Sequence, residues 1–61
     1  MITSNPTILL SIINTKLRDF YDSLDSLCED MDEDRKSIEE ALKNIGYVYN
    51  KEQNQFVLWG E

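Results

Sequence analysis

The chain has 61 residues, a net charge of −6 from 12 acidic and 6 basic residues, one cysteine and no histidine. Such a short chain forms one small domain, and its negative charge disfavours partners such as nucleic acid or an anionic membrane surface. A single cysteine excludes an internal disulfide and, without histidine, a zinc cluster. A core of this size supplies only about 3–5 kcal/mol unless another contribution, such as self-association, adds to it.

The most apolar segment predicts a helix over about residues 6–19. Asn5 suits the cap of its first turn, and Pro6 fits the first helical position, where no amide donor is needed. At about 100° per residue, one broad apolar face of the helix consists of Leu9, Leu10, Ile13, Leu17, Phe20 and Tyr21. The opposite side carries the polar residues Ser11, Asn14 and Arg18. Ile8 and Ile12 fall beside that face, so the apolar arc is wider than usual. Either other elements of the chain cover these two residues, or they contact a second copy.

Two short helices are predicted next, over about residues 24–31 and 35–45. Ser23 is the expected cap of the first, whose apolar stripe is Leu24, Leu27, Cys28 and Met31. Asp34 is the expected cap of the second, with Asp32 as the alternative, and its stripe is Ile38, Ala41, Leu42 and Ile45. Gly46 is expected to end this helix in a left-handed conformation. Glu39 and Lys43 have the spacing of an exposed ion pair.

A β-hairpin is predicted over about residues 47–59, because both ends of this segment are rich in aromatic and β-branched residues. Asparagines bound the connection, and Asn54 suits a left-handed position in it. Alternation along the strand points Tyr47 and Tyr49 one way and Val48 the other. The aromatic residues either complete the core or form a binding platform, and both alternatives stay open for Tyr47, Tyr49, Phe56 and Trp59.

These elements predict an α+β fold in which residues 1–61 form a single small domain. The expected architecture is an open three-helix bundle, with a helix-turn-helix-like second and third helix, followed by the C-terminal hairpin. The predicted core consists of Leu9, Leu10, Ile13, Leu17, Phe20, Leu24, Leu27, Cys28, Met31, Ile38, Leu42, Ile45, Tyr47 and Phe56.

The sequence offers little for catalysis. Without histidine there is no imidazole base for a serine or cysteine nucleophile, and Cys28 lies on an apolar stripe, as a buried thiol would. The acidic segment from Glu29 to Asp34 lacks the central glycine of a calcium loop, which favours a solvated turn. We therefore expect no enzyme, no metal, no cofactor and no small-molecule substrate.

Two functional hypotheses follow. The first is a cytoplasmic protein-interaction module, a homodimer or a binder of another protein, with Ile8 and Ile12 at the contact. The alternative is a winged-helix-like nucleic-acid-binding or regulatory protein, because the hairpin stands where a winged helix has its wing. Glutamates among the lysines of the third helix disfavour that alternative. The apolar run ending at Ile13 is too short to cross a bilayer, and the lone thiol without a signal peptide fits a reducing compartment.

Several separated motifs occur in order: Asn5-Pro6, Leu9-Leu10-Ser11, Asn14 with Lys16-Leu17-Arg18-Asp19, Ser23-Leu24 with Leu27-Cys28, and Gly46-Tyr47 with Tyr49, Asn54 and Phe56. Together they resemble a family of bacterial domains of unknown function of about this length. The resemblance implies a small stand-alone bacterial protein with no assigned activity, and it transfers no functional residues. The chain departs from the family pattern at Glu33, since we expect an apolar residue between Asp32 and Asp34. Arg18 or Asp19 is expected to tie the end of the first helix to the next turn.

Overall fold

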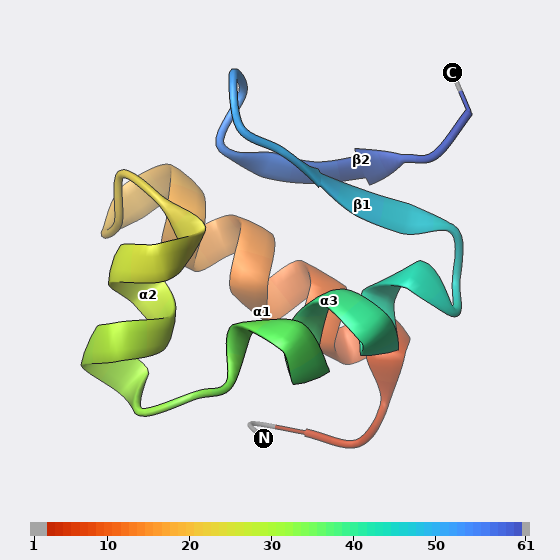
Figure 1. Ribbon diagram of the computed structural model, residues 1–61, viewed down its shortest axis with the longest axis horizontal. Coiled ribbons are helices and arrows are strands. Elements are labelled where there is room, and N and C mark those ends of the chain that lie inside the picture. Colours follow the sequence, from red (N-terminus) through yellow and green to blue (C-terminus); the bar gives the residue numbers. More distant parts are fainter. Residues whose placement is uncertain (1–2, 61) are drawn as a thin grey trace.

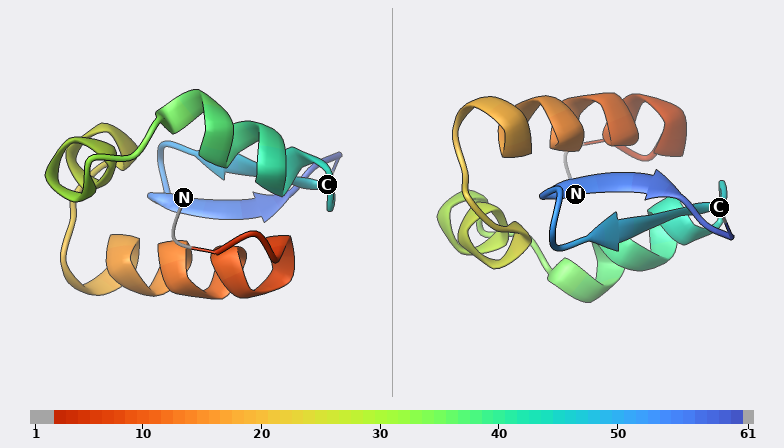
Figure 2. Two further views of the ribbon diagram at one scale, coloured as in Figure 1. Left: turned by 90° about the horizontal axis from the view of Figure 1, so that it is seen from below. Right: turned by 90° about the horizontal axis from the view of Figure 1, so that it is seen from above.

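The computed structural model describes residues 3–60, which form three helices followed by a two-stranded antiparallel hairpin (Figure 1). The helices are α1 (Pro6–Asp19), α2 (Leu24–Met31) and α3 (Arg35–Lys43), and the strands are β1 (Tyr47–Asn50) and β2 (Gln55–Leu58). The hairpin lies across α1 and α3, with β2 next to α1 and β1 next to α3 (Figure 2). The predicted α+β fold and the order of its elements are confirmed.

The core lies where the three helices meet the inner face of the hairpin. Its buried members were all expected from the sequence: Leu9, Ile13, Leu17, Leu24, Leu27, Cys28, Ile38, Leu42 and Phe56. Half-buried side chains pack against them, among them the predicted Leu10, Met31, Ile45 and Tyr47. Each fully buried leucine or isoleucine contributes about 1.5–3 kcal/mol relative to an exposed one, so this cluster is the main source of stability.

Phe20 is not a core residue, and that prediction was wrong. Its side chain is 72% exposed. The helix ends at Asp19, and Phe20 leaves the helical conformation with φ −127° and ψ −25°. Counting it on the apolar face assumed about 100° per residue through position 20, but the change in backbone direction carries the ring away from the core.

The starts of the helices agree with the predicted caps. Asn5 Oδ1 accepts hydrogen bonds from the amides of Thr7 (3.0 Å) and Ile8 (3.3 Å), and Ser23 Oγ accepts one from the Ser26 amide (3.1 Å). Asp34 occupies the cap position of α3, although its carboxylate accepts from the Ser37 hydroxyl (2.9 Å) instead of a backbone amide.

The ends of α2 and α3 refine two predictions. Asp32, the alternative cap for α3, instead ends α2 in a left-handed conformation (φ 56°), and the next amide, of Glu33, donates to the Cys28 carbonyl at 2.8 Å. The third helix stops at Lys43 and not at residue 45, because the Ile45 and Gly46 amides bond only three residues back, in a tighter turn. Gly46 has the expected positive φ of 85°.

The hairpin pairs Tyr47 with Leu58 and Tyr49 with Phe56. The Tyr49 and Phe56 rings both lie toward the helices, with their centroids 5.6 Å apart. Asn54 has the predicted left-handed conformation, with φ 54°.

Candidate functional site

One side of α1 carries apolar side chains that its own chain leaves uncovered. Ile8 is 50% exposed, Ile12 is half-buried, and Phe20 is exposed at the end of the same helix. Residues four apart form a continuous ridge on a helix surface, so Ile8, Ile12 and Lys16 make up one row. Together with Phe20, just past the helix end, we call them the α1 row. The Lys16 ammonium lies 5.8 Å from the centre of the Phe20 ring. The two predicted contact residues therefore lie on an exposed ridge with a third apolar side chain.

On the opposite side of α1, Asn14 joins the helix to β2. Its Nδ2 donates to the Phe56 carbonyl at 3.0 Å, and its Oδ1 accepts from the Phe56 amide at 2.7 Å. Gln55 Nε2 in turn donates to the Asn14 carbonyl at 3.0 Å. The sequence placed Asn14 on the solvent side of the helix, which was wrong. Ile12 and Ile8 lie about 160° and 120° around the helix from Asn14, so this contact directs the α1 row away from the hairpin.

Asn54 holds the end of α1 to the hairpin loop. Its Nδ2 donates to the carbonyl of Leu17 (3.0 Å), one of the groups that a helix end leaves without an intrahelical partner, and to that of Tyr21 (2.9 Å), just beyond the helix. Its left-handed backbone was predicted, but these side-chain contacts were not. The only signal available in the sequence was an asparagine, a residue that tolerates a left-handed conformation, next to a predicted strand.

Arg18 and Asp19 bind each other and not the following turn, contrary to expectation. The guanidinium donates to both carboxylate oxygens, from Nε at 2.9 Å and from Nη2 at 3.0 Å. This hydrogen bonding lowers the pKa of the Asp19 carboxyl. Both side chains are well exposed, so the pair adds little stability.

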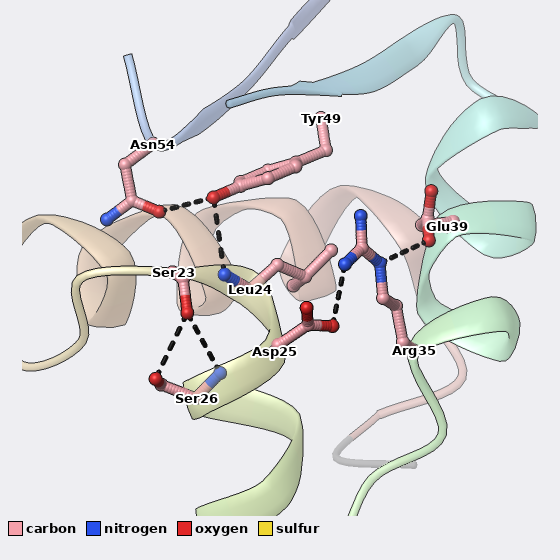
Figure 3. Close-up of polar contacts among 8 residues, drawn as sticks. All are labelled: Ser23, Leu24, Asp25, Ser26, Arg35, Glu39, Tyr49 and Asn54. Carbon is pink, nitrogen blue, oxygen red and sulfur yellow. Dashed lines mark hydrogen bonds and ion pairs between the residues drawn. The ribbon is translucent and has the colours of Figure 1, made fainter. Parts of the chain in front are cut away.

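Polar contacts connect α2, α3 and the hairpin (Figure 3). The Tyr49 hydroxyl accepts from the Leu24 amide at 3.2 Å and donates to Asn54 Oδ1 at 2.7 Å. Arg35 binds Asp25 at 2.6 Å and Glu39 at 2.8 Å, and these two hydrogen bonds raise its pKa. The sequence suggested that Glu39 pairs with Lys43, but Glu39 pairs with Arg35 instead. These charged groups hold elements together.

The groups that would be candidates for chemistry have structural surroundings. Cys28 is buried, and burial raises the pKa of its thiol, the opposite of what a nucleophile needs. In the last turn of α2, Asp30 accepts from the Tyr21 hydroxyl at 2.5 Å, which raises the pKa of Tyr21. Among residues 3–60, no group of three or more acidic or cysteine side chains is arranged to hold a metal ion.

A hollow of about 320 Å³ lies between α3 and the hairpin. Its lining consists of Lys36, Glu39, Glu40, Lys43, Val48, Tyr49 and Trp59. The hairpin aromatics therefore divide: Phe56 is in the core, Tyr47 and Tyr49 pack against it, and Trp59 is 65% exposed. Lys36 and Lys43 share this face of α3 with two glutamates, so it lacks the concentrated positive charge of a nucleic-acid-binding surface and gives no support to nucleic-acid binding.

None of the helices within residues 3–60 has the length and apolar character of a transmembrane segment.

A family model described as Domain of unknown function (DUF4250) matches residues 3–56 of the 61-residue chain. No curated protein and no solved structure matches the sequence. The match spans the three helices and continues into β2. It confirms the resemblance to domains of unknown function, and its description assigns no activity.

Proposed function

Since the chain belongs to the DUF4250 family of domains of unknown function, we propose from its own surface that it is a non-enzymatic interaction module that self-associates through α1. The observation that carries the proposal is the exposure of the α1 row, in which Ile8 is half exposed beside a partly covered Ile12. Single exposed apolar residues are common on protein surfaces. Apolar side chains at three of the four residues of the α1 row are a more specific feature.

The row has the geometry of a helix–helix contact. Ridges formed by residues four apart pack into the grooves of a second helix, commonly at a crossing angle of about −50°. In a two-fold dimer the same surface is used on both copies. We place the two-fold axis near Ile12, so that Ile12 meets its counterpart and Ile8 packs toward Lys16 of the other copy. The aliphatic part of the lysine side chain can cover the isoleucine while its ammonium stays in water.

Self-association also suits the size of the chain. A core of nine buried side chains within residues 3–60 leaves a small margin of stability. Covering a partly exposed isoleucine on each copy adds apolar burial that the monomer lacks. A non-catalytic role is supported by the surroundings of Cys28, Arg35 and Asp30, which all serve packing or internal hydrogen bonds.

Sedimentation equilibrium of three proteins tests the proposal. The native chain should show a concentration-dependent dimer, and Ile12→Glu should be a folded monomer, because the two glutamates would meet at the two-fold axis and lose their hydration there. Thr7→Glu is the matched control, since it adds the same charge at an exposed position on another side of α1 and should still dimerise. A native chain that stays monomeric at high micromolar concentration would refute the proposal, as would loss of the dimer in both variants.

A further inference from the structure

The two edges of the hairpin differ in how their backbone groups are used. On β2, the outward N–H and C=O of Phe56 both bind the Asn14 side chain, at 2.7 and 3.0 Å. The side-chain amide thus takes the place of a neighbouring strand. No comparable group within residues 3–60 binds the outer edge of β1.

The register identifies which groups of β1 are free. In an antiparallel ladder, directly opposed residues alternate between exchanging hydrogen bonds and turning these groups outward. Phe56 turns its groups toward Asn14, so its partner Tyr49 must turn its own N–H and C=O away from β2. The same alternation applies to Tyr47, two residues earlier, and the bond from the Trp59 amide to the Gly46 carbonyl (2.7 Å) fits this phase. Tyr47 and Tyr49 therefore present a free strand edge.

The free edge borders the hollow between β1 and α3, which is lined by Val48, Trp59 and the polar side of α3. An exposed strand edge binds an extended backbone, and adjacent hollows accept its alternate side chains. We propose that β1 accepts an extended segment of another protein as a third strand, seated over α3. This surface is separate from the α1 row and does not depend on self-association.

The surroundings of the edge favour a single peptide segment over a second copy. Both views in Figure 2 show α3 running alongside β1 and extending past its outer edge. One added strand would rest on α3, as a strand rests on a helix in a two-layer domain. A second copy joined edge to edge would bring its own α3 into the space that the first α3 occupies.

The charges of the hollow indicate the chemistry of the segment. Lys36 and Lys43 form no ion pair within residues 3–60, whereas Arg35 already binds Glu39. Glu40 is the remaining carboxylate, so the two free lysines outnumber it. Residues opposite Tyr47 and Tyr49 would face α3, and the residue between them would lie beside Val48 and Trp59. The preferred segment is therefore acidic, apolar, acidic at three successive positions.

The palindromic peptide acetyl-TEVET-amide is a suitable probe, because it offers this pattern in either strand direction. Amide hydrogen exchange measured by NMR is the readout. In the free protein the Tyr47 and Tyr49 amides should exchange faster than those of Val48 and Phe56. With the peptide at about ten times its Kd, exchange of the two tyrosine amides should slow roughly tenfold, since only the unbound fraction exchanges. The already bonded Val48 and Phe56 amides should not gain comparable protection.

Two controls separate the backbone and charge parts of the proposal. The same peptide N-methylated at both glutamates keeps its side chains but lacks the two amide donors, and it should not bind. Lys43→Glu should weaken binding, whereas Lys51→Glu, the same charge change at the exposed hairpin tip, should not.

The proposal is overturned if Tyr47 and Tyr49 gain no protection, if the N-methylated peptide binds equally well, or if acetyl-TKVKT-amide binds more tightly. Protection that rises with protein concentration alone would assign the edge to a second copy. Because the Ile12→Glu variant should bind the peptide as the native chain does, its behaviour separates this proposal from self-association.

Discussion

Replacing Asn14 with alanine tests the contact that joins α1 to the hairpin. The substitution removes two hydrogen bonds to one residue, the 2.7 Å bond from the Phe56 amide and the 3.0 Å bond to its carbonyl. Each is worth about 1 kcal/mol net, and a buried group left unpaired costs about 1–3 kcal/mol. Alanine returns roughly 0.6 kcal/mol through its higher helix propensity. We therefore expect Asn14→Ala to lower the free energy of unfolding by roughly 2 kcal/mol.

That loss is large for so short a chain. At about 0.05–0.15 kcal/mol per residue, a domain of this length has roughly 3–9 kcal/mol of stability in total. A loss of 2 kcal/mol corresponds to a fall in Tm of roughly 8–16 °C. Urea and thermal denaturation followed by far-ultraviolet circular dichroism would measure it, with Thr15→Ala as the control. Thr15 is exposed on the same helix, so its replacement reports the propensity change alone. Equal stabilities for the two variants would refute the role assigned to Asn14.

Three further predictions use the same measurements. Asn54→Gly should be more stable than Asn54→Ala by about 1 kcal/mol, because glycine accepts the positive φ while both variants lose the bonds to Leu17 and Tyr21; equal stabilities would contradict this. Phe20→Ala should cost under about 1 kcal/mol and Leu17→Ala about 2–5 kcal/mol, as expected for an exposed and a buried side chain; a larger loss at Phe20 would place it in the core after all. The hydrogen bond to Asp30 raises the pKa of Tyr21 in the folded state above its ordinary value near 10. The stability that this hydrogen bond contributes is therefore complete below pH 10 and is lost as pH rises through the folded pKa. Tyr21→Phe should therefore show a smaller loss of stability above pH 10 than the native chain, and identical pH profiles would show that the bond to Asp30 is not formed.

The sequence predicted the fold where a feature is local. Asn5, Ser23 and Gly46 act through their immediate neighbours, so their effects on helix starts and ends could be identified without knowing the fold. The nine buried side chains were likewise predictable, because helical and strand periodicity places them on one side of each element. The prediction for Phe20 failed because the apolar face was extended past the predicted end of the helix at about residue 19, where helical periodicity no longer applies.

The polar contacts between distant segments could not be predicted. Asn14 and Phe56 are 42 positions apart, and nothing near either residue in the sequence indicates a partner. The same holds for Asn54 with Leu17 and for Tyr49 with Leu24. These side chains satisfy backbone groups that the fold would otherwise leave unpaired, so they become recognisable only when the elements are in place. The candidate contact surface was predictable in part, since Ile8 and Ile12 lie outside the main apolar face, but Phe20 was not expected to join them.

Isotope-filtered NOE spectroscopy on a mixture of labelled and unlabelled chains tests self-association through α1 most directly, because it detects only contacts between copies. We predict intermolecular NOEs from the methyl groups of Ile12 to Ile12 of the other copy, and from those of Ile8 to the Lys16 side chain of the other copy. Intermolecular NOEs that arise only from other surfaces, such as Trp59, would contradict the account, as would their complete absence at high micromolar concentration.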